Sequence, residues 1–152
     1  MTPRNVLLFL LALLGLGALG GSAVMRVSPS GQLLGMRLSM LGGSPFHSSL
    51  IPGFILFTEL GVVPCLLVVA LLKKPASPVA ERLNFFTSLH WAWTGSTYVA
   101  FALIIWIQFE MVLLHAVSRL HTAHMGWTLA ILLVALLPKI RTLHKKTEAA
   151  ST

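Results

Sequence analysis

The sequence predicts an all-α fold, a four-helix transmembrane bundle with an ordered extracytoplasmic loop between its first two helices. The chain has 152 residues, of which 56% are hydrophobic and 10% charged, and its mean hydropathy is +0.86. A soluble domain of this size buries too small a fraction of its surface to hide so much apolar area, so the solvent we expect is lipid. Within a single domain over 1–152, apolar runs close to the ~20 residues that cross a bilayer occur at about 6–24, 50–72, 89–114 and 120–137.

The positive charge of the chain lies beside these runs. The formal net charge of +7 is by itself typical of nucleic-acid binding, but charges that flank membrane spans indicate topology instead. We therefore expect the lipid bilayer, and no nucleic acid, as a partner. We expect a protein of the cell inner (plasma) membrane. The positive-inside rule predicts that both termini lie in the cytoplasm, because only three basic residues (Arg26, Arg37 and Arg119) fall on the opposite side. The other eight fall on the side of the termini: Arg4, Lys73, Lys74, Arg82, Lys139, Arg141, Lys145 and Lys146.

The first run, about 6–24, carries two glycines four residues apart, Gly17 and Gly21. This spacing lets a neighbouring helix approach closely, either within the chain or from a second copy in a homo-oligomer. A G-x-G-x-x-G pattern from Gly15 to Gly20 is not a dinucleotide site, because no strand precedes it. The run also resembles a secretory signal peptide with a cleavage site near Ala23, but the three later runs favour a retained helix.

The stretch from Ser28 to Gly53 is neither an apolar span nor a charged linker. Leu34, Leu38 and Leu41 recur there at helical spacing around Arg37. This pattern predicts a short amphipathic helix on the membrane surface or against the bundle. Turn residues flank it on both sides, so we expect an ordered loop.

The same stretch contains an uncommon series of motifs. They are Gly35-Met36, Leu38 to Leu41, Ser44-Pro45-Phe46, Leu50-Ile51-Pro52-Gly53 and Leu56-Phe57, and the pattern continues from Ala102 to Gln108. In these motifs the chain resembles a family of small, uncharacterised four-helix bacterial integral membrane proteins. The resemblance covers most of the chain and implies the same membrane fold, but it supplies no functional residues. Arg37 and Glu110 depart from the family, which often has proline and apolar residues at these positions.

Several residues in or beside the later runs shape the expected helices. Pro64 in the second run lacks an N–H and is expected to kink the helix. Glu59 in the same run should face the bundle interior, because a carboxylate inside a bilayer is costly unless it is paired, protonated or hydrated. After a basic linker, the third run is expected to extend as a helix back through Asn84. The fourth run is short and ends at Pro138.

Two carboxylates inside these runs are the leading candidates for a ligand or proton site. If the second and third helices are antiparallel, Glu59 and Glu110 both fall in the outer half of the membrane. They could share a proton, meet Arg37 folded in from the loop, or line a small polar cavity with Gln108. The rival interpretation is a structural ion pair, or protonated glutamates that hydrogen-bond within the bundle.

Three histidines precede or begin the fourth run. His121 and His124 share a helical face, and with His115 or the carboxylate of Glu110 they are weak candidates for a metal site. No H-E-x-x-H pattern or cysteine pair supports it, and histidines at a membrane boundary are more often interfacial, so we predict no metal and no cofactor. No nucleophile has both a base and an orienting acid beside it, so we predict no catalytic residue.

These observations favour a non-enzymatic integral membrane protein that binds a small apolar ligand or accompanies a larger membrane assembly. For ligand binding, the loop after the first run would act as a lid, with Arg37 reaching a lipid head group. A cap that only seals the bundle is the simpler role for this loop. The alternative function is a small transporter or proton-linked protein that uses Glu59 and Glu110.

Overall fold

The computed structural model describes residues 1–27, 50–114 and 119–146, and in these ranges every regular element is helical. Three helical segments of the described ranges are long and apolar enough to cross a membrane: Pro3–Val24, Gly53–Lys73 and Trp91–Val112. The all-α prediction is thus confirmed, and the three apolar helices support the membrane prediction. The loop predicted around Arg37 lies outside the described residues.

The helices follow the predicted apolar runs. In order they are α1 (Pro3–Val27), α2 (Leu50–Ile55), η3 (Leu56–Val62), α3 (Val63–Lys73), α4 (Pro78–Arg82), α5 (Trp91–Leu114), α6 (Arg119–Leu136) and α7 (Pro138–Leu143). The segments α2, η3 and α3 follow one another directly and form one rod, in which η3 is π-helical. The helix α6 covers the fourth predicted run but is not among the three span-length helices, and its first turns are polar. That α6 also crosses the membrane stays a prediction.

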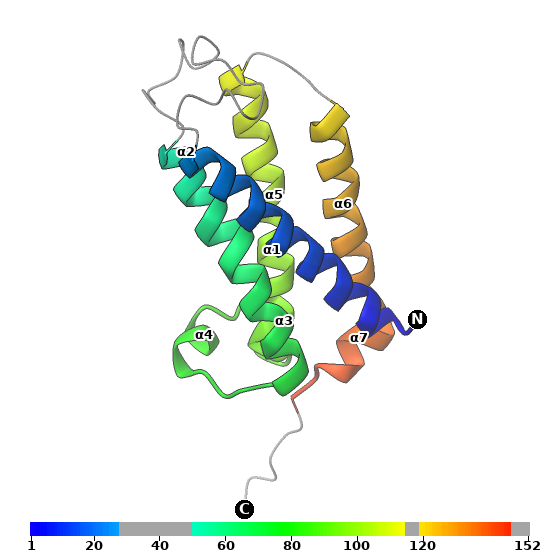
Figure 1. The fold of residues 1–152 in the computed structure, drawn as a ribbon. Helices are drawn as coiled ribbons and strands as arrows, with labels where there is room; N and C mark the ends of the chain where they lie inside the picture. The colour runs from blue at the N-terminus through cyan, green and yellow to red at the C-terminus, as the bar shows by residue number, and fades with distance from the viewer. Residues whose placement is uncertain (28–49, 115–118, 147–152) are drawn as a thin grey trace, which may run out of the picture.

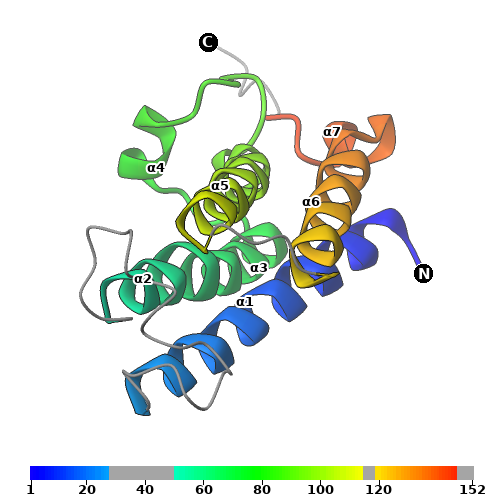
Figure 2. The same ribbon diagram turned by 90° about the horizontal axis from the view of Figure 1, so that it is seen from above.

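The long helices pack side by side (Figure 1). α1 lies along η3 and α3 and also contacts α6, and α5 packs against α6 and α3. Seen from above, α1 and the α2–η3–α3 rod lie on one side and α5 and α6 on the other (Figure 2). The start of α1, the end of α3, α4 and α7 lie at one end of the bundle. We call it the basic end, because these segments and the residues directly after them carry Arg4, Lys73, Lys74, Arg82, Lys139, Arg141, Lys145 and Lys146.

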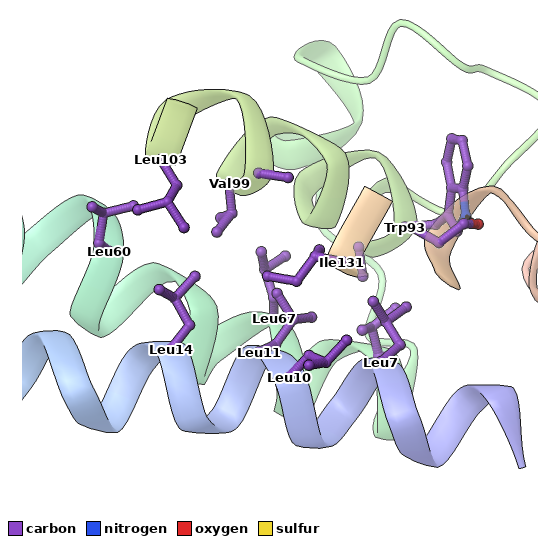
Figure 3. Packing of buried hydrophobic residues seen from close by; sticks show 14 of the residues in the cluster. Leu7, Leu10, Leu11, Leu14, Leu60, Leu67, Trp93, Val99, Leu103 and Ile131 are labelled. Carbon is purple, nitrogen blue, oxygen red and sulfur yellow. Dashed lines mark hydrogen bonds between the residues drawn. The ribbon is translucent and has the colours of Figure 1, made fainter. Parts of the chain in front are cut away.

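A leucine-rich face of α1 lies at the centre of the core (Figure 3). Leu7, Leu11 and Leu14 repeat at helical spacing and are buried. Lipid tails are as apolar as leucine, so the helices associate through close van der Waals packing rather than through a hydrophobic driving force. The side chains that meet this face come from the other long helices and include Leu60, Leu67, Val99, Leu103 and Ile131.

α1 approaches the η3 and α3 segments closely at Gly15. A Cβ atom on Gly15 would lie 2.6 Å from Cys65 Sγ and 3.0 Å from the backbone oxygen of Gly61. A Cβ on Gly17 would meet no described atom within 4 Å, and one on Gly21 would meet only a leucine methyl at 3.6 Å. The two predicted glycines therefore do not mark this contact within the chain. Their contact with a second copy stays a prediction.

The widened turn of η3 precedes the proline of its rod. Pro64 has no N–H, and in a regular α-helix its ring would crowd the carbonyl of Leu60, four residues earlier. In the structure, the N–H of Val63 donates to the carbonyl of Thr58, five residues back, which is the π-helical pattern. The irregularity expected at Pro64 thus takes the form of a π-helical turn, and Glu59 lies within it.

One buried asparagine fixes the connection between α3 and α5. The amide nitrogen of Asn84 donates to the carbonyl of Leu89 at 2.8 Å and to Glu81 Oε2 at 3.0 Å. Its oxygen accepts from the Thr94 hydroxyl at 2.5 Å and from the N–H of Phe86 at 3.2 Å. The helical extension predicted back through Asn84 is wrong, because these four bonds require a folded turn before α5.

The basic segment that follows α6 is folded. It forms α7 and then an isolated antiparallel bridge between Lys145 and Leu89, which precedes α5. The Nζ atom of Lys74 donates to the carbonyl of Leu143 at 2.6 Å. These bonds connect α7 to the α3–α5 connection and close the basic end of the bundle.

Candidate functional site

Glu110 and His121 meet between α5 and α6, near the end of the bundle opposite the basic end. His121 Nε2 lies 3.7 Å from Glu110 Oε2, and the exposed fractions of the two side chains are 9% and 31%. The indole of Trp106 and the imidazole of His124 also interact with the carboxylate. The proximity of Glu110 to His121 and His124 that the sequence suggested is therefore present.

This pair has the chemistry to hold or transfer a proton. An imidazole and a carboxylate at this separation form an ion pair when the imidazole is protonated, and after the loss of that proton they become a neutral imidazole beside a carboxylate. The carboxylate of Glu110 remains partly exposed, so a proton or a polar ligand has access to it from the surface of the bundle. His121 is the more buried of the two side chains.

Glu59 lies on the outer surface of the α2–η3–α3 rod. Its side chain is exposed. At a rise of about 1.5 Å per residue, Glu59 lies about 9 Å along the helix axis from Gly53, where the apolar segment begins. The two described salt bridges do not include it. The prediction that Glu59 faces the bundle interior is wrong for the described chain, because the next two residues take the inward positions: Leu60 is buried, and Gly61 lies against Leu19 of α1. The large exposed residues of the rod around Glu59 are apolar: Ile51, Phe54, Leu66, Val69 and Leu72.

The structure does not bring the predicted site residues into one site. The groups that interact with Glu110 are an indole and two histidines, and Glu59 is not among them. Gln108 is exposed on α5, while Arg37 and His115 lie outside the described residues. In the described part of the chain, no group of three or more His, Cys, Asp or Glu side chains is arranged to hold a metal ion.

Sequence reasoning missed the polar network of the basic end. In addition to Asn84, this network contains the buried His144. The Nδ1 atom of His144 lies 2.9 Å from the carbonyl of Ile140, and its Nε2 atom has no described hydrogen-bond partner. Burial lowers the pKa of His144 below its ordinary value, which favours the neutral imidazole. His90 Nδ1 accepts the N–H of Ala92 at 3.2 Å at the start of α5. The available signal was Asn84 itself, because asparagine is typical of turns.

Comparison with known proteins assigns no family to this chain. No family model, curated protein or solved structure matches it. The resemblance to small bacterial membrane proteins stays an expectation.

Proposed function

We propose that this chain is an integral membrane protein that assembles with a helix of another membrane-spanning chain, and that Glu59 is the polar contact in this assembly. The observation that carries the proposal is the exposed carboxylate of Glu59 on an otherwise apolar face. A charged side chain at the centre of a membrane helix costs about 3 kcal/mol in insertion experiments. No described residue pairs with Glu59 to offset this cost, and a hydrogen-bond donor from a partner helix would do so.

The local structure of the rod supports this assignment. π-helical turns occur frequently at functional sites, and Glu59 lies within the one formed by η3. Phe54 and Leu66 flank it with exposed fractions of 61% each, which provides apolar area for helix packing. In this assembly the basic end faces the cytoplasm by the positive-inside rule, and the Glu59 face lies in the outer half of the inner membrane.

Photo-crosslinking in native membranes tests the proposal. We expect benzoylphenylalanine at position 54 or 66 to give a crosslinked product of one defined mass. Glu59→Leu should reduce the yield of this product about tenfold, because polar contacts between membrane helices contribute roughly 1–2 kcal/mol. The matched control places the same crosslinker at Leu133, an exposed residue of α6, from which we expect no such product.

Thermal unfolding provides the second arm of this test. Glu59→Leu removes a carboxylate that no described residue pairs with, so the isolated chain should be as stable as the native one or more stable. A crosslinked product whose yield does not depend on Glu59 would contradict the proposal. Crosslinks to lipid alone from both positions would do the same.

The Glu110–His121 pair favours a second function, proton-linked transport. It joins two titratable groups from different helices, one buried and one partly exposed. Intramembrane carboxylates and histidines of this kind commonly form proton relays. In this alternative, the pair takes up the proton that accompanies a substrate, and Glu59 has no part in the step.

Proteoliposomes loaded with a pH-sensitive dye test the second function. Glu110→Gln and His121→Ala are expected to lower proton uptake at least about tenfold, because a positioned acid–base group contributes that much or more. Gln108→Ala changes an exposed residue of the same helix and should leave uptake unchanged. Uptake by the native protein no faster than by empty liposomes would exclude this function, as would full uptake by Glu110→Gln.

A further inference from the structure

A short segment at the basic end exposes several large apolar side chains, and three of them are exposed by two thirds or more. Val79, Leu83 and Phe85 have exposed fractions of 72%, 68% and 87%. Val79 and Leu83 are four residues apart and share one face of α4 and its C-cap, and Phe85 follows in the next turn. We name these three residues the α4 patch. Figures 1 and 2 show α4 to the side of the bundle, away from α6.

The α4 patch lies at the level of the membrane surface. α4 connects two span-length helices, Gly53–Lys73 and Trp91–Val112, at their common end. The hydroxyl of Tyr98 in α5 donates to the carbonyl of Leu83 at 2.9 Å and accepts from the N–H of Phe85 at 3.5 Å. Side chains of a helix lean toward its N-terminus, so this contact holds the patch beside the first turns of α5. The patch therefore lies in the layer between acyl chains and water.

The patch is fixed in place by hydrogen bonds. Asn84, which lies between Leu83 and Phe85 in the chain, is buried and makes four hydrogen bonds. The hydroxyl of Ser77 accepts the N–H of Ala80 at 3.3 Å and caps α4. The ring of Phe85 packs edge to face on Tyr98, with 6.5 Å between the ring centroids. Apolar side chains that a folded segment holds outward in this way indicate an interaction surface.

The charge beside the patch is positive. Arg82 in α4 and Lys73 at the end of α3 are exposed, and neither belongs to a described salt bridge. Glu81 is already bound by Lys146 Nζ, 2.6 Å from its Oε2 atom. Each basic side chain near an anionic bilayer surface strengthens binding about fivefold. An apolar patch with free basic residues thus complements an anionic leaflet.

We propose that the α4 patch binds anionic phospholipid in the leaflet at the basic end. Val79, Leu83 and Phe85 insert among the upper parts of the acyl chains, and Arg82 and Lys73 bind the phosphates of the head groups. Interfacial segments of this kind combine buried apolar area with attraction to anionic lipid. The proposal does not depend on the Glu59 face of the α2–η3–α3 rod or on the assembly proposed for it.

Fluorescence quenching of the full chain in vesicles tests this proposal. In a Cys65→Ser background, Phe85→Cys carries an NBD label, and Ala76→Cys, exposed in the same connection, is the matched control. Brominated phosphatidylglycerol, as a minor component of phosphatidylcholine vesicles, should quench the label at 85 more strongly than an equal amount of brominated phosphatidylcholine. Arg82→Gln should reduce this preference about fivefold. The label at 76 should show no preference and be quenched by aqueous acrylamide.

Three outcomes would overturn the proposal. Equal quenching at position 85 by the two brominated lipids would exclude binding of the anionic head group. Acrylamide quenching at 85 as strong as at 76 would place the patch in water. Protection of position 85 from both acrylamide and brominated lipid would mean that another protein covers it. A label at Val79→Cys repeats the measurement without removing the contact between Phe85 and Tyr98.

Discussion

Replacing Gly15 with valine is expected to destabilise the bundle by about 1–3 kcal/mol, the range of overpacked cores. A Cβ atom there would overlap Cys65 Sγ and press on the backbone oxygen of Gly61. The sulfur has room to rotate, but the oxygen belongs to the backbone of η3, so α1 and η3 must separate. Thermal unfolding in detergent, followed through the reactivity of the single cysteine, should give a lower midpoint.

Gly17→Val is the matched control for this substitution. Gly17 lies two residues further along the same helix, and a Cβ atom on it would meet no described atom within 4 Å. We expect a change within about 0.5 kcal/mol, as for other substitutions on an exposed surface. Equal midpoints for the two variants would show that α1 does not contact η3 at Gly15.

Asn84→Ala is expected to destabilise the basic end by about 3 kcal/mol. The substitution removes four hydrogen bonds and leaves the carbonyl of Leu89 and the hydroxyl of Thr94, which are buried, without this partner. Each buried polar group left unsatisfied costs about 1–3 kcal/mol. Hydrogen exchange should show the effect directly, because the amides of Phe86 and Leu89 should exchange much faster in the variant.

Asn5→Ala provides the control for the asparagine substitution. Asn5 is exposed in the first turns of α1, so its replacement should leave exchange at the basic end unchanged. Unaltered protection of residues 84–90 in Asn84→Ala would show that the connection is held by other contacts.

The three long apolar helices were predictable because an apolar run is a property of composition along the chain. The orientation of each helix about its own axis was not. In a lipid-embedded helix both the packed and the exposed faces are apolar, so periodicity does not distinguish them. Gly15 and Gly17 are chemically identical, yet only Gly15 is packed against η3. Glu59 is exposed rather than directed inward for the same reason.

The candidate sites depended on contacts between distant segments. His121 and Glu110 were both visible in the sequence, where they were considered together only as weak candidates for a metal site. The turn at Asn84 was missed because its partners lie further along the chain: Leu89 is five residues away and Thr94 ten. Local helix propensity carries no information about such bonds.

The bridge between Leu89 and Lys145 sets an order of events during synthesis. Leu89 and the start of α5 leave the ribosome first, whereas Lys145 emerges only after α6 and α7 have been made. Until then the nascent chain carries an open basic end, with Lys74 still lacking the carbonyl of Leu143. Domains of a growing chain fold as their residues become available. Closure of this end is therefore a late step, because it requires residues that are synthesised after all three long apolar helices.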